Sequence, residues 1–477
     1  MPAYGGSYEG NGSPTNETDN AQLAGFGRAV RYGFPYRINV YGDSTGNDST
    51  DWPRRMVTMA GGLGSLYPEV NFTHLAWSDA AQGYTSFEQQ QIGSAGVPYV
   101  TLDGFAQTDC ITTPHAAAMN TTDIELEFGY RPVTVTADGN EHVICSRFNA
   151  GGTRAFRLYI SSTATFVFEW SVDGTALTSY NMGSISSLGF AAGVWRNWKL
   201  TFDADNGSGG YTITLYRQTT TGAAYTGSYT SAATTTGGST TSVFAGTIPF
   251  LIGARGSESA PINSLEGDVS FLAYKSGIGG SIVLGFSAGR LVSGETSCVG
   301  WTGETWTLRS GAGGTATAHT KTGGVEVLTL NGSVAGQTIS YADDDTRFPK
   351  MTPSPSDLAI VNFGHNETTT ETTWPAAMAT FLSRARTTSP NTAIMLSIQN
   401  PQLTGATNPQ LHARRCQGLR QLAAIQRYAY VDAYKTFVDY GDYATGLMNG
   451  GGDYVHPNTS GYDVWAMAAV RSFAGWQ

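Results

Sequence analysis

The sequence predicts an α/β domain built on a parallel sheet and interrupted by an antiparallel β-sandwich. Short unbroken apolar runs alternate with helix-like segments near both ends of the chain, which is typical of a parallel sheet covered on both faces. Between residues 108 and 312, short alternating segments are separated by Gly, Asn and Asp turns. The composition agrees, because 60 glycines and only 13% charged residues favour β-structure with many turns and an uncharged polar surface.

The length of 477 residues is enough for two or three domains. We expect a polar N-terminal lead-in at 1–35 and a first part of the α/β domain at 36–107. The sandwich follows at 108–312, and a second part of the α/β domain at 313–477. The first residues have neither a basic start nor an apolar stretch, so they do not predict a signal peptide.

The α/β elements are expected in the following order. A β-rich run that ends in a Gly turn predicts a strand at 37–44, and a helix follows at 52–63, with Pro53 in its first turn. Later apolar runs predict strands at 325–330, 358–363, 392–398 and 428–431. Apolar residues at helical spacing predict a helix at 411–427.

The sandwich strands are recognised by their period of two. Such segments occur at 124–128, 156–160, 165–170, 198–202, 211–216 and 269–274. The Thr- and Gly-rich stretch at 218–241 is expected to be a long loop.

Composition also excludes several classes of protein. The net charge of −10 argues against a nucleic-acid binder driven by bulk charge. No run of about 18 apolar residues is present, so we expect no membrane span. The four cysteines form no CxxC pair, which excludes zinc ribbons and redox motifs and favours free buried thiols over a Cys110–Cys298 disulfide. We expect no cofactor and no metal; Asp203, Asp205 and Asn206 share a loop, but a solvated turn explains them as well as a calcium site does.

Three short segments carry the groups that a serine hydrolase needs. Ser44 follows the first strand and is the candidate nucleophile, placed where a helix is expected to begin. His456 is the candidate base, and Asp453, three residues earlier, can reach its Nδ1 from the same loop. Asn366 follows another strand and offers a side-chain amide to an oxyanion. Each segment alone is more often a turn, a cap or a surface pair, but their joint occurrence in this chain order favours a catalytic site.

The segment 42–46 also fits the G-x-S-x-G elbow of α/β-hydrolases, but there the acid and base lie on separate loops. The GDS block and the DxxHPN block together instead resemble the SGNH (GDSL-type) hydrolase family, over residues 36–64 and 324–475. The resemblance implies a discontinuous, flavodoxin-like parallel-sheet domain. It also implies a two-step acyl transfer, with Ser44, Asp453 and His456 as catalytic residues.

The same resemblance implies an oxyanion hole. Its donors would be the N–H groups of Ser44 and Gly336 and the amide of Asn366, with Gly83 as the rival for the glycine role. The third block reads GHNE, so Glu367 stands where the family usually has Asp. His365 beside the key Asn becomes a candidate for substrate contact.

The segments at 195–203, 249–253 and 267–269 resemble a concanavalin/laminin-G-type jelly roll over about 108–312. Such modules often bind glycans, although Trp170, Trp195 and Trp198 fit a core equally well. The expected function is a serine esterase that removes O-acetyl groups from a polysaccharide or a cell-surface glycan.

The low-charge, Gly- and Thr-rich composition is also similar to that of phage tail components. This similarity implies a location on a virion, acting at the host cell surface, or otherwise in the cytoplasm, with homo-oligomeric or virion assembly. Two alternatives stay open. One is a non-catalytic glycan-binding or structural tail protein that keeps a hydrolase fold. The other is a glycoside hydrolase using Glu125 and Glu127, which lie two apart on one strand.

Overall fold

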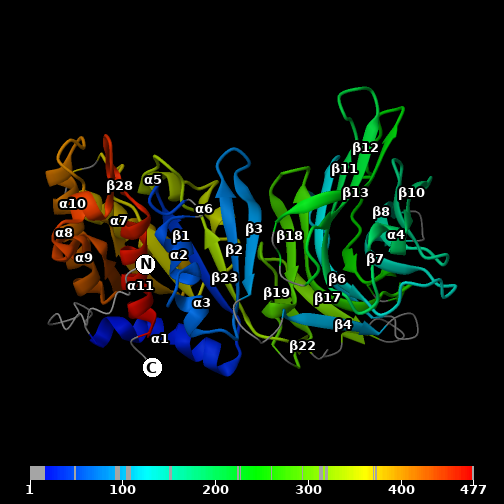
Figure 1. The fold of residues 1–477 in the computed structure, drawn as a ribbon, viewed down its shortest axis with the longest axis horizontal. Helices are drawn as coiled ribbons and strands as arrows, with labels where there is room; N and C mark the ends of the chain where they lie inside the picture. Colours follow the sequence, from blue (N-terminus) through cyan, green and yellow to red (C-terminus); the bar gives the residue numbers. More distant parts are fainter. Residues whose placement is uncertain are drawn as a thin grey trace.

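The computed structural model describes residues 17–47, 50–91, 97–103, 109–149, 153–222, 225, 227–258, 260–292, 294–310, 315–316, 321–368, 370 and 373–474. It has two parts that lie side by side, an α/β part and a β-sandwich (Figure 1). Within the described residues, no helix combines the length and the apolar character that a membrane span requires.

The α/β part is centred on a seven-stranded sheet with the order β26-β25-β24-β1-β23-β2-β3. All neighbouring strands are parallel except β2 and β3. The strands are β1 (Tyr36–Gly42), β2 (Asn71–Ser78), β3 (Gly83–Gln91), β23 (Glu326–Asn331), β24 (Leu358–Asn362), β25 (Ala393–Ile398) and β26 (Ala429–Asp432), and the hairpin of β27 (Met448–Gly450) and β28 (Asp453–Pro457) lies apart. The sheet therefore takes strands from both sides of the sandwich, and β1, β23, β24, β25 and β26 lie where the apolar runs predicted strands.

Helices cover both faces of this sheet. The helices of this part are α1 (Glu17–Tyr32), α2 (Trp52–Thr58), α3 (Leu63–Leu66), α5 (Ile339–Ala342), α6 (Phe348–Met351), α7 (Trp374–Thr388), α8 (Pro409–Gln426), α9 (Ala433–Tyr440), α10 (Tyr443–Gly446) and α11 (Thr459–Ala474). Successive strand residues point to opposite faces: Ile38 and Val40 pack with α1, α2 and α11, whereas Tyr41 packs with α7. This alternation into two apolar layers fixes the register of β1.

The prediction of a polar lead-in at 1–35 is wrong for residues 17–32, which form helix α1. Leu23, Phe26 and Val30 are buried and share one stripe of this helix. The Phe26 ring packs edge-on against Tyr36 and Phe473, with centroids 5.4 and 5.1 Å away. A narrow apolar stripe of three residues is thus enough to dock the helix. Residues 1–16 lie outside the described residues.

The predicted antiparallel sandwich is present. One sheet contains β5 (Cys110–Thr113), β7 (His142–Asn149), β8 (Thr153–Ile160), β9 (Thr165–Trp170), β10 (Thr178–Ser184), β14 (Phe250–Ile252), β19 (Ser297–Val299), β20 (Thr305–Ser310) and β21 (Thr315–Ala316). The other contains β4 (Tyr99–Asp103), β6 (Ile124–Pro132), β11 (Arg196–Asp203), β12 (Tyr211–Gln218), β13 (Tyr229–Gly237), β17 (Glu266–Ser276), β18 (Ile282–Ser287) and β22 (Lys321–Thr322). The hairpin of β15 (Arg255–Ser257) and β16 (Ala260–Ile262), helix α4 (Ile185–Leu188) and two 3-10 turns, Ala117–Met119 and Ala288–Arg290, complete it.

Two sequence expectations for the sandwich differ from the structure. Strands β4 and β22 pair with each other, so the sandwich extends beyond 108 and 312 on both sides. Strand β13 falls inside 218–241, which was expected to be a loop; its threonines pair with β12 in an exposed edge strand. The strand consists mainly of Thr, Ser and Ala and has no strongly apolar face, which hides it from a hydrophobic pattern.

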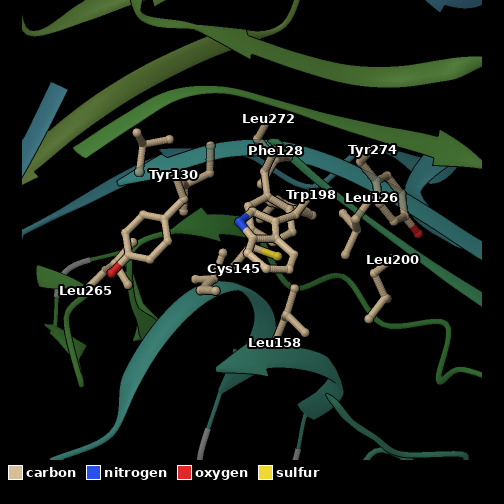
Figure 2. Packing of buried hydrophobic residues seen from close by; sticks show 14 of the residues in the cluster. Leu126, Phe128, Tyr130, Cys145, Leu158, Trp198, Leu200, Leu265, Leu272 and Tyr274 are labelled. Atoms are coloured by element: carbon tan, nitrogen blue, oxygen red, sulfur yellow. The ribbon is translucent and has the colours of Figure 1, made fainter. Parts of the chain in front are cut away.

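The two sandwich sheets enclose one large apolar core. Trp198 and Leu272 of one sheet meet Cys145 and Leu158 of the other (Figure 2). Trp170 is buried in the same core, whereas Trp195 is half-buried near Tyr99. Two of the three tryptophans considered for sugar binding are therefore core residues.

The sandwich and the α/β part share a second core. Phe87 on the edge strand β3 packs against Phe271, Trp301 and Tyr225 of the sandwich, with ring centroids 4.3–5.3 Å apart. The buried Glu326 of β23 accepts hydrogen bonds from the Trp301 indole and from a threonine of β2. The sandwich and the edge of the sheet are therefore packed together through one continuous apolar cluster.

The four cysteines are buried free thiols, as expected. Burial raises the pKa of each thiol, which makes them poor nucleophiles.

Candidate active site

Three adjacent parallel strands end beside one another and carry the predicted site. Strand β1 lies between β23 and β24, and Gly42 at its end pairs with Asn362 of β24. Ser44 follows β1 by two residues, Asn366 follows β24 by four, and Gly336 follows β23 by five. Because the carboxyl ends of parallel strands meet at one edge, this is where an α/β sheet places its ligands.

Ser44, His456 and Asp453 form a continuous hydrogen-bonded chain. The Ser44 Oγ lies 2.7 Å from His456 Nε2. On the other side of the imidazole, Nδ1 lies 3.1 Å from both carboxylate oxygens of Asp453. With Nδ1–H donated to Asp453, Nε2 is left to accept the serine proton, which is the arrangement of a nucleophile, its base and an orienting acid.

The Asp453 carboxylate is held in its charged form. Its Oδ1 accepts hydrogen bonds from the backbone N–H groups of His456 and Val455, at 3.0 and 3.1 Å, and Asn449 donates to Oδ2 at 3.2 Å. Burial alone would raise the pKa of Asp453, but the N–H groups of His456 and Val455 lower it below its usual range. A carboxylate that stays charged can orient the imidazole and stabilise its protonated form.

The turn that presents Ser44 is anchored by buried polar groups. Asp43 Oδ1 accepts hydrogen bonds from the Thr45 N–H and hydroxyl at 3.1 and 2.8 Å, and Gln399 Nε2 donates to Oδ2 at 2.9 Å. Burial raises the pKa of the Asp43 carboxyl. Glycine suits position 42, because a Cβ there would lie 2.7 Å from the Ser333 hydroxyl oxygen and 3.0 Å from the Asn362 carbonyl oxygen.

The expectation that a helix begins at Ser44 is wrong. Residues 44–47 form turns, and the next helix, α2, starts at Trp52. The Asp43 network, rather than a helix N-terminus, therefore fixes the backbone around the nucleophile.

The oxyanion candidates lie on neighbouring turns. The Asn366 amide donates to the Gln337 carbonyl over 3.4 Å, so it lies against the residue that follows Gly336. Gly336 is exposed with a φ of +73°, and nothing lies within 4 Å of where its Cβ would be. The rival Gly83 begins β3 at the far edge of the sheet, where its Cβ position lies 2.3 Å from the Ser281 hydroxyl oxygen of the sandwich. Of the two glycines, only Gly336 is next to Asn366.

His365, the candidate for substrate contact, is instead a buried link between segments. Its ring is 8% exposed and stacks on His412 at 4.2 Å. Nε2 lies 3.1 Å from Asn400 Oδ1, and the Gln402 amide donates to Nδ1 at 3.1 Å. Burial lowers the pKa of His365 to about 3, so the ring is neutral and both ring nitrogens are already used.

Asn400 extends this link to His456, the candidate base. Its Nδ2 donates to the Val455 carbonyl at 2.8 Å, directly before His456. The turn bearing Asn366 and the loop bearing His456 are thus joined through His365 and Asn400. The sequence analysis missed Gln399 and Asn400, although two amides directly after the strand at 392–398 are a usable signal, since they sit at the same sheet edge.

Glu367 connects the Asn366 turn to the segment after Gly336. Its carboxylate is buried and accepts a hydrogen bond from the Ile339 N–H at 2.6 Å. Burial raises the pKa of Glu367 to about 7. Glu367, which stands where the family usually has Asp, thus helps to hold together the turns that bear Asn366 and Gly336.

Glu367→Gln is expected to stabilise the protein at pH 8 but not at pH 4. The folded protein binds this proton more tightly than the unfolded chain, so charging Glu367 costs stability as the pH rises from about 4.5 to about 7. Glutamine still accepts the Ile339 hydrogen bond without a charge. Thermal unfolding from pH 4 to 8 measures this effect. The free energy of unfolding of the variant should increase relative to that of the wild type as the pH rises, by on the order of 3 kcal/mol at pH 8. A difference that does not change with pH would contradict the assignment.

The two residues of the glycoside-hydrolase alternative, Glu125 and Glu127, are not available for catalysis. Glu125 and Glu127 are buried, and Lys275 Nζ lies 2.6 and 2.8 Å from their carboxylates. The hydroxyls of Tyr225 and Tyr229 donate to the other oxygen of Glu127, and the Gly279 N–H donates to that of Glu125. All four carboxylate oxygens are occupied by the fold, so the pair is a buried ion cluster rather than an acid and a base.

The Asp203–Asn206 loop is held by its own hydrogen bonds. Asn206 Oδ1 accepts hydrogen bonds from the N–H groups of Ser208 and Gly210 at 3.0 and 3.3 Å, which closes the turn. Over the described residues, no group of three or more His, Cys, Asp or Glu side chains is arranged to hold a metal ion.

The GDSL-like lipase/acylhydrolase family matches residues 278–464 of the chain. The match begins inside the sandwich and includes Asn366, Asp453 and His456, whereas Ser44 lies outside it. It identifies a GDSL-like lipase/acylhydrolase domain in this part of the chain.

No curated protein matches the sequence. Similar solved structures include a member of the lipolytic protein G-D-S-L family from Veillonella parvula, at 16% identity and a TM-score of 0.27, over 31% of this chain and 79% of that one. The acetylxylan esterase Axe2 from Geobacillus stearothermophilus has 16% identity and a TM-score of 0.27, over 32% and 74%. A lipase/acylhydrolase from Enterococcus faecalis has 16% identity and a TM-score of 0.26, over 32% and 77%. Likeness at this level says nothing about the substrate of this chain.

Proposed function

We propose that the GDSL-like domain of this chain is a serine esterase, which hydrolyses O-acetyl or similar small acyl esters on a carbohydrate. One observation carries the proposal: the Ser44 hydroxyl, the His456 imidazole and the Asp453 carboxylate are in hydrogen-bond contact, at 2.7 and 3.1 Å. The sandwich, whose sequence resembles glycan-binding jelly rolls, supports the choice of a carbohydrate.

The reaction proceeds in two steps. His456 Nε2 takes the proton of Ser44 Oγ as the oxygen attacks the ester carbonyl, and Asp453 stabilises the imidazolium. The tetrahedral oxyanion is held by the N–H groups of Ser44 and Gly336 and by the Asn366 amide. The imidazolium of His456 then gives its proton to the sugar oxygen as the bond from that oxygen to the acyl carbon breaks, so the sugar leaves as an alcohol and an acyl-serine remains. Water, deprotonated by His456, attacks this ester and releases the acid.

A fluorophosphonate probe tests the nucleophile directly. The wild-type protein is expected to form a covalent adduct on Ser44, which mass spectrometry of the digested protein locates. An unlabelled Ser44, together with no hydrolysis of 4-nitrophenyl acetate, would favour the alternative of a non-catalytic binding protein. A location on a virion remains a separate prediction, which electron microscopy of immunogold-labelled particles would check.

Asn366→Ala is expected to lower kcat on 4-nitrophenyl acetate by about 10²–10³-fold, with little change in KM. The amide acts on charge that develops only in the transition state, so its loss appears in kcat. Asn391→Ala, at an exposed turn, is the matched control. If Asn366→Ala were as active as the Asn391→Ala control, the Asn366 amide would have no role in the oxyanion hole.

A further inference from the structure

An open groove of about 610 Å³ lies beside the proposed oxyanion hole. One wall is the turn between β2 and β3, with Asp79 and Gln82; the other runs from Gln337 to Arg347. Gln337 is also the residue whose carbonyl accepts the Asn366 amide. The β2–β3 turn and α5 stand at the same edge of the sheet as β28, which carries the catalytic histidine (Figure 1). The groove therefore begins at Gln337, directly beside the two proposed oxyanion donors Gly336 and Asn366.

The groove is polar, and Asp79 places an exposed carboxylate in it. Asp79 accepts hydrogen bonds from the Tyr341 hydroxyl and from the Gln82 amide. Arg347 pairs with Asp344 at 3.6 Å, and its guanidinium lies 4.2 Å over the Tyr341 ring. The remaining lining residues offer amides and hydroxyls. Because Asp79 meets only neutral donors and Arg347 is already paired with Asp344, such a surface disfavours an anionic ligand. It also has little apolar area for a long acyl chain, whereas sugar hydroxyls match its mixed donors and acceptors.

The aromatic wall of the groove is held in one position. The Tyr341 hydroxyl accepts a hydrogen bond from the Trp77 indole at 3.2 Å while it donates to Asp79, and Arg347 covers one face of the ring. A wall fixed in this way loses little conformational entropy when a ligand binds.

We propose that this groove is a subsite for a neutral sugar unit next to the one that bears the ester. The inference rests on the proposed esterase activity and deepens it, because it selects neutral oligosaccharides over anionic polymers and over long-chain lipid esters. The sugar unit would contact Tyr341, Gln82 and Gln337 while its acylated neighbour reaches Ser44.

Two groove variants test the subsite. Gln82→Gly removes an amide at a position whose φ of +48° suits glycine, and Tyr341→Phe removes a hydroxyl but keeps the ring. Both are assayed on partially O-acetylated xylo-oligosaccharides and manno-oligosaccharides, on O-acetylated pectin, and on 4-nitrophenyl acetate. We expect the double variant to lose at least tenfold in kcat/KM on the neutral oligosaccharides, mainly through KM, and less than twofold on the aryl acetate. Tyr32→Phe, at the exposed end of α1, is the matched control.

The outcomes separate the subsite from the esterase. A wild-type protein that cleaves 4-nitrophenyl acetate but releases acetate from neither neutral oligosaccharide, or prefers the anionic pectin, would overturn the subsite and leave the esterase standing. Unchanged oligosaccharide kinetics in the double variant, or equal losses on every substrate, would also overturn it. A wild-type protein that neither cleaves the aryl acetate nor reacts with the fluorophosphonate probe would overturn the esterase itself.

Discussion

Replacing Ser44 with alanine is expected to lower the hydrolysis of 4-nitrophenyl acetate by about 10⁴–10⁶-fold, leaving only what the oxyanion donors and binding supply. The Oγ that lies 2.7 Å from His456 is the atom proposed to form the acyl-enzyme, and no neighbouring hydroxyl in contact with His456 replaces it in the described site. The measurement is initial-rate kinetics, with acetate release from acetylated oligosaccharides as a second readout.

The control for this experiment is Ser65→Ala, which removes an exposed serine hydroxyl from the short helix α3. Its activity should equal that of the wild type, and both variants should unfold at the wild-type temperature. Ser44→Ala with more than a tenth of the wild-type rate would show that the hydrolysis, if any, proceeds without this nucleophile.

Lys275→Met is expected to destabilise the protein by about 3–5 kcal/mol, because it leaves Glu125 and Glu127 buried without their cation. Burial alone would lower the pKa of Lys275, but Glu127 and Glu125 raise it, which marks a cation that the fold holds charged. Methionine has a similar length, so the packing loss is small. Urea unfolding followed by tryptophan fluorescence measures the change.

The matched control is Lys435→Met. Lys435 pairs with Asp439 on an exposed helix face, where such pairs contribute at most about 1 kcal/mol. Equal effects of the two substitutions would mean that the Lys275 cluster is no more than a solvated ion pair. Aryl-acetate hydrolysis by folded Lys275→Met protein should match the wild type, since the cluster takes no part in the proposed chemistry.

The sequence predicted the parts of the fold whose signal is local. The buried strands β1, β23, β24, β25 and β26 appear within one or two residues of the apolar runs, since a strand covered on both faces is apolar throughout. The candidates for nucleophile, acid and base could be chosen from the sequence because Asp453 and His456 share one loop and Ser44 comes two residues after a strand. The structure brings these three into contact as expected.

What the sequence did not predict depends on contacts between distant segments. The ring nitrogens of His365 are occupied by Asn400 and Gln402, which follow a different strand, so its support role was invisible in the local motif GHNE. Helix α1 carries only a narrow apolar stripe in a polar segment. Glu125 and Glu127 look like a catalytic pair until Lys275, about 150 residues later, is placed between them.

The pairing of β4 with β22 has a consequence for how the chain folds. Strand β1 pairs with β23, which lies roughly 290 residues later in the chain. Closing the loop between them costs conformational entropy, and this cost grows with loop length. Once the sandwich has formed, Val100 and Lys321 are neighbours, and the loop that remains to be closed is only about 70 residues, which lowers that cost by about 1 kcal/mol. We therefore expect the sandwich to fold first during refolding, and the crevice that holds Ser44 to assemble last.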